Sequence, residues 1–401
     1  MKAHSLAPYI KKQIEHRFGG ATRRYAVAQS LFSSHQIDTG TQHLLRSLAD
    51  QDLGHLRKIL DLGCGYGPLG ISLTALAPKS EIHLVDRDAL AVAFAQHNGN
   101  LNDITNLRAY GSLGYDSVAD RDFDLIVSNI PGKAGEPAIR AFLLGAAQVL
   151  SPEGLVTVVV VSPLAALVRQ TLTQPGIEIP FERAAAAHTV FHYRFTEQGI
   201  SDVPLHWDDG IYDRATTTFV LDEVTLPLRT VRGLPEFDSL SYESVLAYKS
   251  LRDLRDDVYE RICVVAPGQG LLPVLLWQQF SPRWVDLVGR DLLALRTSRQ
   301  NLLDHGCRDE AITLHHTPLL VPQDTDPNLV VGRLDSNDGP DAAEHALMVA
   351  ATELEPGKEI LLVGGSTPVT RLLKSKDIGK LLRTSKRRRA KGNSTALFIR
   401  K

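Results

Sequence analysis

A glycine-rich turn after Asp61 is the first segment of this sequence that could do chemistry. In KILDLGCGYGPLGISL an apolar run ends at that acid, and an apolar helical pattern follows Gly63, Gly65 and Gly67. Glycines allow a tight bend and a close approach of the backbone to a ligand, and the start of a helix offers unpaired N–H groups. A second apolar run ends at Asp86, where a carboxylate can accept hydrogen bonds from both hydroxyls of a ribose. The pattern therefore indicates a ligand that contains a nucleoside.

Two cofactors fit this turn to different degrees. Gly65, Gly67 and Gly70 satisfy the GxGxxG dinucleotide fingerprint, although Pro68 lies inside it. The fuller pattern, Asp-x-Gly-x-Gly-x-Gly, places Asp61 where it could meet a cationic amine rather than a pyrophosphate. S-adenosylmethionine has an amino acid end, a ribose and no phosphate, so we favour it over NAD, with a ligand-free turn as the third interpretation.

The elements that must position this turn alternate between strand and helix. Apolar strands that alternate with helices predict a parallel sheet covered on both faces. The predicted strands cover residues 57–62, 81–86, 106–110, 123–129 and 155–161, and the helices cover 70–77, 88–100 and 136–150, with Asp88 as a cap and SPEG as a stop. HTVFHYRF and STALFIRK are expected to pair at sheet edges, and residues 216–231 to form a hairpin.

The chain also contains two copies of one pattern. Residues 31–98 align without a gap with residues 234–301, ending with Asn98 over Asn301. A period of about 200 residues is too long for a solenoid repeat, so each copy should be a domain.

We therefore predict an α/β protein with two tandem Rossmann-like, doubly wound sheets, one in residues 1–200 and one in residues 201–401. The second copy has lost the polar groups of the first and is expected to be degenerate. The replacements are Val264 for Asp61, Ala266 for Gly63, Gly289 for Asp86 and Arg333 for Asn129.

Composition excludes several classes of protein. No apolar run approaches the ~20 residues of a membrane span, and no secretory leader is evident, so we expect a soluble cytoplasmic protein. Cys64, Cys263 and Cys307 lack CxxC or Cys/His spacing, which argues against a disulfide framework or a metal site.

The net charge of -2 hides two basic segments. KKQIEHRFGGATRRY is one, and the stretch from Lys374 to the end has eleven Lys or Arg against one acid. Such patches are typical of a nucleic-acid partner. The alternative is a solvated loop at KRRRAKGN, which contains Lys386, Arg387, Arg388 and Arg389.

On these stretches the sequence resembles the class I S-adenosylmethionine-dependent methyltransferases, and more closely the tandem-domain ribosomal RNA guanine-N2 methyltransferases. The matching stretches are LFSSHQIDTGTQHLL, ILDLGCGYGPLG, LVDRD and DFDLIVSNIPG. The resemblance implies cofactor binding by Asp61, Gly63, Gly65, Gly67, Asp86, Arg87, Ser112 and Asn129. It also implies that Phe32, Asp38 and Thr41 lie over the cofactor on the substrate side. The alternative for this last segment is an ordinary helix start capped by Asp38 or Thr41.

The segment after the fourth strand departs from the family. Where the family has Asn-Pro-Pro followed by an aromatic, this chain has Asn129, Ile130, Pro131 and Gly132. The resemblance implies that Asn129 and the Ile130 carbonyl accept the two N–H bonds of a target amine, and Pro131 favours the extended backbone that presents this carbonyl. The ring that would stack on the base is missing. Lys133 could contact a phosphate or simply be solvated, and no general base is evident.

The expected function is methylation of an exocyclic base amine of RNA, with ribosomal RNA as the leading substrate. The second copy, through Lys386 to Arg389, is expected to grasp RNA phosphates or else only to stabilise the first copy. In the resembling family the degenerate copy comes first, whereas here it comes second. A methyltransferase of a small molecule or protein side chain, and a non-catalytic RNA-binding protein, remain as alternatives.

Overall fold

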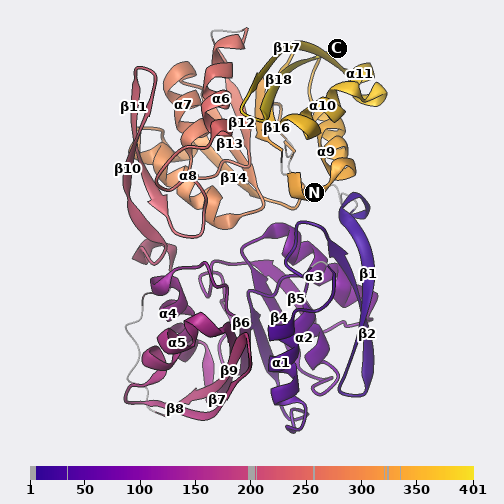
Figure 1. Cartoon of the computed structure of the whole chain (residues 1–401), viewed down its shortest axis with the longest axis vertical. Coiled ribbons are helices and arrows are strands. Elements are labelled where there is room, and N and C mark those ends of the chain that lie inside the picture. Colours follow the sequence, from indigo (N-terminus) through magenta and orange to yellow (C-terminus); the bar gives the residue numbers. More distant parts are fainter. Residues whose placement is uncertain are drawn as a thin grey trace. The chain divides into compact units, whose positions relative to one another are not determined.

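The computed structural model of the chain describes residues 6–33, 35–196, 204, 206–255, 258–319, 321–322, 325–334 and 336–401. It divides into two compact units. The first unit is Ile10–Tyr212, and the second is Asp213–Lys401 together with the described residues before Ile10. Figure 1 draws the first unit in indigo to magenta and the second in pink to yellow. The division between residues 212 and 213 differs from the predicted one at 200, because a strand of the second unit already begins at Asp213.

The first unit is built on a seven-stranded sheet with the order β5-β4-β3-β6-β7-β9-β8. Strands β3 to β7 are parallel, and β9 and β8 are antiparallel to their neighbours. The chain moves outward from β3 to β5 and then returns to place β6 on the other side of β3. The strands are β3 Lys58–Leu62, β4 Glu81–Asp86, β5 Leu107–Gly111, β6 Phe123–Asn129, β7 Leu150–Val161, β8 Ile177–Ala184 and β9 His188–Phe195. A ligand site is expected at the carboxyl ends of β3 and β6, where the order reverses.

The helices of the first unit bury apolar faces against this sheet. Helix α1 packs on β7 and β9, and α3 packs on β4 and β5. Asp88 caps α3 as predicted, since its Oδ1 accepts a hydrogen bond from Leu90 N at 2.8 Å. The helices are α1 Thr39–Leu48, α2 Pro68–Leu73, α3 Ala89–Leu101, α4 Glu136–Leu144 and α5 Ala165–Leu172.

The end of α4 differs from the prediction. The helix stops at Leu144, a 3-10 turn covers Gly145–Gln148, and β7 already begins at Leu150. SPEG therefore lies inside a strand instead of ending a helix. The pairing of β6 with β7 jumps from Phe123–Leu150 to Leu125–Leu155, so the strand accommodates the extra residues as an irregularity.

The second unit repeats the same topology with the order β14-β13-β12-β15-β16-β18-β17. Its strands are β12 Arg261–Val265, β13 Trp284–Gly289, β14 Ile312–His316, β15 Leu329–Arg333, β16 Glu359–Gly365, β17 Leu382–Ala390 and β18 Asn393–Arg400. Its helices are α6 Tyr242–Ser250, α7 Leu271–Phe280, α8 Leu292–Asp304, α9 Pro340–Glu353, α10 Ser366–Lys374 and α11 Lys376–Leu381. The predicted fold, two tandem Rossmann-like sheets, is confirmed.

Two predictions about sheet edges were wrong. HTVFHYRF forms β9 and STALFIRK falls in β18, but each of these strands is second from the edge, because β8 and β17 lie outside them. The run Lys386–Arg389 belongs to edge strand β17 and is not a loop; the turn of this hairpin consists of Lys391 and Gly392.

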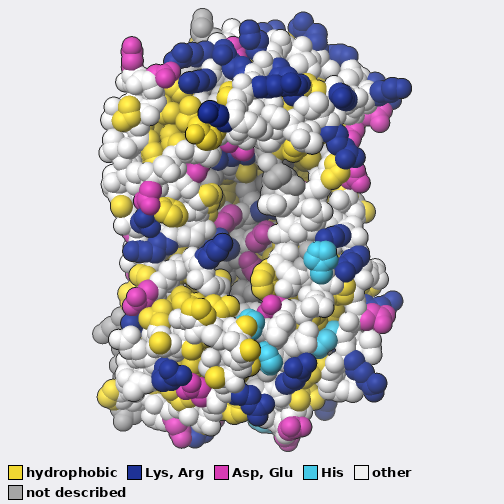
Figure 2. Space-filling view, in the orientation of Figure 1, with side chains coloured by type: hydrophobic (Ala, Val, Ile, Leu, Met, Phe, Trp, Pro, Cys, Tyr) yellow, Lys and Arg dark blue, Asp and Glu magenta, His cyan; other side chains and the backbone are white. Residues whose placement is uncertain are grey.

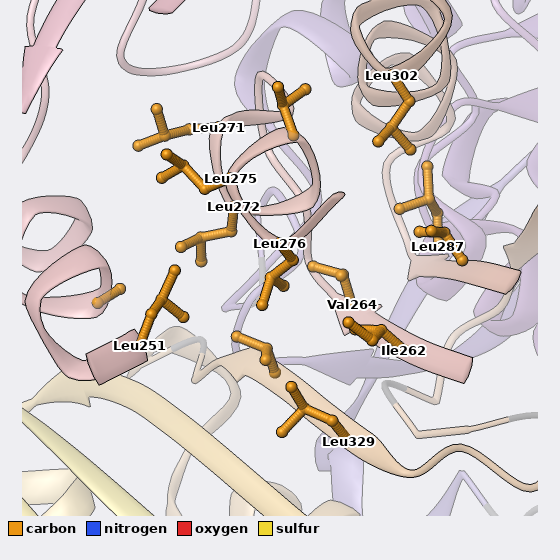
Figure 3. Close-up of a cluster of buried hydrophobic side chains, with 14 of the residues drawn as sticks. Leu251, Ile262, Val264, Leu271, Leu272, Leu275, Leu276, Leu287, Leu302 and Leu329 are labelled. Carbon is orange, nitrogen blue, oxygen red and sulfur yellow. The ribbon is translucent and has the colours of Figure 1, made fainter. Parts of the chain in front are cut away.

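Each unit also carries a separate two-stranded hairpin. The predicted one is β10 Asp213–Leu221 with β11 Val224–Val231, and the first unit has its counterpart, β1 Ile10–Phe18 with β2 Ala21–Ala28. Phe219, Leu226 and Leu228 of the second hairpin join the buried core that Figure 3 shows around α7 and β12.

One buried asparagine ties each hairpin to its unit. The Asn98 side chain on α3 accepts from Ala26 N at 2.7 Å and donates to Ala26 O at 3.0 Å and to Tyr66 O at 2.9 Å. Asn301 on α8 repeats all three bonds with the counterpart residues Arg229 and Gln269. The aligned asparagines are therefore a shared structural clamp.

Replacing Asn98 by Ala should lower the free energy of unfolding by about 2–4 kcal/mol, because buried backbone groups lose their partners. Hydrogen exchange should speed up in β2 for Asn98→Ala and in β11 for Asn301→Ala. Asn100→Ala, an exposed change on the same helix, serves as the control. Equal protection of β2 in Asn98→Ala and in the control would contradict the clamp.

Candidate functional site

The glycine turn lies at the carboxyl end of β3, where the strand order reverses. Gly63 N and Cys64 N both donate to Val85 O at 2.9 Å, which binds the turn to the end of β4. Gly63 and Gly65 have φ of +75° and +56°, and a Cβ added to either would meet no atom within 4 Å. The left-handed backbone explains the glycines, and the space above them is open to a ligand.

Asp61 is the last residue but one of β3 and is fully buried. Its Oδ2 accepts a hydrogen bond from Gly70 N at 2.8 Å, whereas its Oδ1 has no hydrogen-bond partner among the described residues. The pKa of the Asp61 carboxyl is raised to about 7, mainly by burial and also by the nearby charge of Asp86, while the hydrogen bond from Gly70 N–H opposes the shift. A buried carboxylate oxygen without a partner costs free energy unless a donor arrives. This oxygen therefore suits a cationic or N–H group of a ligand.

Asp86 holds the turn from the neighbouring strand. Its Oδ2 accepts from Gly65 N and its Oδ1 from Asp88 N, both at 2.9 Å. The side chain is half-buried, and a carboxylate is a group that can accept hydrogen bonds from ribose hydroxyls. Arg87 follows it and is also half-buried.

Ser112 lies beside Asp86 but its side chain is engaged within its own loop. Its backbone N–H donates to Asp86 O at 2.9 Å. The hydroxyl donates to Gly114 O at 2.7 Å and accepts from Ser117 N at 3.0 Å, and the residue is only 2 % exposed. The structure thus brings Ser112 to the site as a loop anchor, and any contact with an adenine would have to come from its backbone or its one remaining lone pair.

Asn129, at the end of β6, is bound to the start of α1. Its Nδ2 donates to Asp38 Oδ2 at 3.0 Å and to Thr41 Oγ1 at 3.2 Å. Asp38 also caps α1, since the same oxygen accepts from Gly40 N and Thr41 N. The helix-cap interpretation of this segment is thus confirmed for Asp38. Because a carboxylate only accepts hydrogen bonds, the amide NH2 must face Asp38 and the Asn129 Oδ1 must face away.

Two residues of this cluster escaped the sequence analysis. A Cβ at Gly40 would lie 2.9 Å from both Asp38 Oδ2 and the His188 ring, so a larger residue there would have to displace one of these side chains. The spacing of Asp38, Gly40 and Thr41 could have indicated Gly40 from the sequence. No local sequence pattern links this segment to His188 on β9.

The segment after Asn129 is partly buried and partly open. Ile130 is 3 % exposed and its N–H donates to Val159 O at 3.0 Å, while Pro131 and Lys133 are exposed. A Cβ at Gly132 would make only ordinary contacts at 3.6 Å or more, so the aromatic of the family pattern is not excluded by lack of space. Phe32 is 70 % exposed.

In the second unit an ion pair replaces the Asn129 cluster. Arg333 Nη1 lies 3.1 Å from Glu236 Oε2, and Arg333 Nη2 donates to the hydroxyl of Ser244, the counterpart of Thr41, at 2.6 Å. Ala266 keeps the positive φ, 53°, of the glycine it replaces. The backbone frame has survived, and the arginine that replaces Asn129 is held by Glu236 and Ser244.

The crevice of the second unit is also filled. Arg290, the counterpart of Arg87, pairs with Asp338 at 2.6 Å, and its guanidinium carbon lies 4.9 Å from the centroid of the Tyr9 ring. These three residues are at most 9 % exposed, and a cavity of only about 40 Å³ remains beside them. Tyr9 thus covers the Arg290–Asp338 pair, which follows the end of β13.

The described residues provide no cluster of three or more His, Cys, Asp or Glu side chains that could hold a metal ion. Within the same described part of the chain, no helix is both long and apolar enough to cross a membrane.

The sheet order and the glycine turn after its central strand define a class I methyltransferase fold in the first unit. Residues 24–174 match the family model of the methyltransferase small domain. The predicted resemblance is therefore confirmed.

Curated relatives match the same part of the chain. YbxB of Bacillus subtilis, an uncharacterized protein, is 32% identical over 131 residues, which are 32% of this chain and 64% of that protein. Ribosomal RNA small subunit methyltransferase C of Hahella chejuensis is 35% identical over 133 residues, covering 32% and 37%. Ribosomal RNA large subunit methyltransferase G of Streptomyces coelicolor is 32% identical over 135 residues, covering 32% and 35%. The chain thus spans less than two thirds of each of these relatives.

One solved structure matches the whole layout. The T. thermophilus 16S rRNA N2 methyltransferase (RsmC), solved in complex with AdoMet and guanosine, aligns with 98% of this chain and 99% of its own, with a TM-score of 0.66 and 15% identity. At this identity the match establishes the tandem fold.

The raised pKa of Asp61 should make stability depend on pH. The folded pKa, about 7, lies above that of an unfolded aspartate, about 3.9, so the folded protein binds the extra proton and its stability falls as pH rises from about 4 to about 7. Asp61→Asn removes this loss. Its melting temperature relative to wild type should rise between about pH 4 and about pH 7 and then level off, whereas the exposed change Asp50→Asn should show no such trend.

Proposed function

We propose that this protein is an S-adenosylmethionine-dependent methyltransferase whose first unit methylates an exocyclic amine of an RNA base, with guanine N2 of ribosomal RNA as the substrate. The observation that carries the proposal is the fixed amide of Asn129, whose Nδ2 is held by Asp38 and Thr41 so that its Oδ1 faces away from Asp38. The names of the relatives supply the substrate class. The substrate would place the protein in the cytoplasm.

The residues of the first unit fit the cofactor. Asp61 offers its unpartnered Oδ1 to the amino acid end, Gly63 and Gly65 leave room above the turn, and Asp86 can accept from the ribose. S-adenosylmethionine, when bound, supplies a methyl group on a sulfonium and so needs no further activation. Positioning of the acceptor and exclusion of water are the tasks left to the protein.

Asn129 would orient the target amine. Its Oδ1 accepts one N–H of the amine and the Ile130 carbonyl accepts the other, which leaves the nitrogen lone pair free to attack. Ile130 can serve this role because its buried side chain and its bond to Val159 O fix the backbone. The amide of Asn129 cannot turn over without losing its bond to Asp38, so the acceptor is held ready before substrate arrives.

Gly132 is the observation that favours a second candidate, a methyltransferase of a small molecule or a protein amine. The residue lacks the ring that stacks a base, and a side chain there would make only ordinary contacts with Val161 and Leu164. The exposed Phe32 offers an aromatic surface in the first unit. Transfer to unmodified ribosomal RNA, compared with transfer to free amines, decides between the two candidates.

Asn129→Ala should lower methyl transfer by about 10²–10³-fold, because the amine loses a fixed acceptor. Calorimetric titration should show S-adenosylmethionine affinity close to wild type, with one site per chain. Asp86→Ala is the matched comparison, since it should abolish cofactor binding itself. Full activity of Asn129→Ala, or two cofactor sites per chain, would contradict the proposal.

Asp38→Asn should separate the positioning of Asn129 from the stability of α1. Asparagine caps a helix as well as aspartate does, so the melting temperature should stay close to wild type. It can also donate, so the Asn129 amide would no longer be held in one orientation. We expect kcat to fall about 10-fold or more with cofactor affinity retained, and wild-type kcat in this variant would show that the contact is only structural.

A further inference from the structure

Edge strand β17 carries five cations in nine residues, LRTSKRRRA. It is the last strand of its sheet, so one side of its backbone has no strand neighbour. In Figure 2 the Lys and Arg side chains gather over the area where Figure 1 draws β17, β18 and α11.

Two of these cations are used within the unit. Arg388 pairs with Asp253 through two bonds, one of them at 2.6 Å, and Arg387 Nη2 donates to Thr370 Oγ1 at 2.5 Å. They fix the strand to the helices on its two faces. Arg383, Lys386 and Arg389, with Lys391 in the following turn, are exposed and form no ion pair with any described acid. Within the predicted run, Lys386 and Arg389 are therefore the cations left for a ligand.

A hollow of about 830 Å³ lies beside the strand. Hydroxyls and cations dominate its lining, namely Ser366, Thr367, Thr370, Arg371, Lys374 and Arg389. The two carboxylates that also line it are engaged, since Glu344 accepts from Ser375 and Asp377 pairs with Lys380 at 2.6 Å. Such a set of donors suits phosphate oxygens.

An exposed aromatic stands next to the same hairpin turn. Tyr242, the first residue of α6, is 62 % exposed, and Lys391 Nζ lies 5.6 Å from its ring centroid. On the other side of the turn, Ser366 N donates to Gly392 O at 2.8 Å, which joins the turn to the hollow. The ring and the hollow therefore flank one two-residue turn.

We infer that this face of the second unit binds single-stranded RNA, with phosphates in the hollow and along β17 and one base stacked on Tyr242. An exposed ring beside unpaired cations suits a polyanion with aromatic bases better than an acidic peptide, which has no bases to stack. The choice of RNA rests on the proposed function. The degenerate unit would then contribute to substrate binding, although it has lost the counterparts of Asp61, Asp86 and Asn129.

The first test measures binding of a fluorescently labelled single-stranded oligoribonucleotide to the full chain. Arg389→Glu with Lys391→Glu should weaken binding by about 10-fold or more, and should flatten the slope of log K against log salt by about 0.7 for each phosphate that the protein no longer neutralises. The control, Lys79→Glu with Arg308→Glu, makes the same charge change at exposed cations elsewhere and should stay within about 2-fold of wild type. Equally weakened binding in the two double variants would overturn the inference.

The second test isolates stacking. Tyr242→Ala should weaken binding by about 5- to 100-fold with the salt slope unchanged, while Tyr242→Phe should bind as wild type does. Affinity unchanged by Tyr242→Ala, or equal affinity for duplex RNA and heparin, would reduce the face to a general anion surface and overturn the assignment.

Failure of this inference and failure of the proposed function give different results. If these variants lose RNA binding and no form of the protein transfers methyl groups, the RNA-binding face is supported and the proposed methyltransferase activity is contradicted. If the wild-type protein transfers methyl groups but substitutions at Tyr242 and in β17 leave its RNA affinity unchanged, the proposed activity is supported and the proposed RNA-binding face is contradicted.

Discussion

The structure depends on one buried amide that appears twice. Asn98 joins its hairpin, its glycine turn and its helix through three hydrogen bonds, and Asn301 does the same in the second unit. A buried amide must be satisfied, so its three partners are fixed relative to one another. The turn that faces the ligand is therefore held from behind by a group that takes no part in chemistry. This explains why the asparagine persists in a copy whose other polar groups have changed.

The two units differ in the polar residues at the positions that correspond to the candidate site. In the first unit Asp61 keeps an oxygen without a partner, a cost that makes sense if a ligand supplies the donor. The second unit has Val264 at that position, and the remaining charges pair internally as Arg333 with Glu236 and Arg290 with Asp338. The charges near the corresponding positions of the second unit are thus paired within that unit.

The sequence allowed us to predict those features of the fold and the site that leave a recognisable pattern of residues. The parallel strands, the glycine turn, the Asp88 cap and the duplicated register all follow from short-range periodicity, and the structure agrees with them. Hairpin β1–β2 and edge strands β8 and β17 were missed because exposed strands with charged side chains lack an apolar signature. The contact of Asn129 with Asp38 joins residues 91 positions apart, so only the tertiary fold could show it. The engagement of Ser112 within its own loop is likewise a property of the folded backbone and not of any single position.

The outermost strands of the two sheets have a consequence for the free protein. An unpaired strand edge is a template on which another chain can add a strand and begin aggregation. β8 interrupts this template with Pro180 and carries Glu178 and Glu182, whereas β17 relies on positive charge alone. Like charges keep two β17 edges apart, and only an anion can approach one closely. The side chains that would receive a nucleic acid are thus also those that prevent the sheet from growing when none is bound.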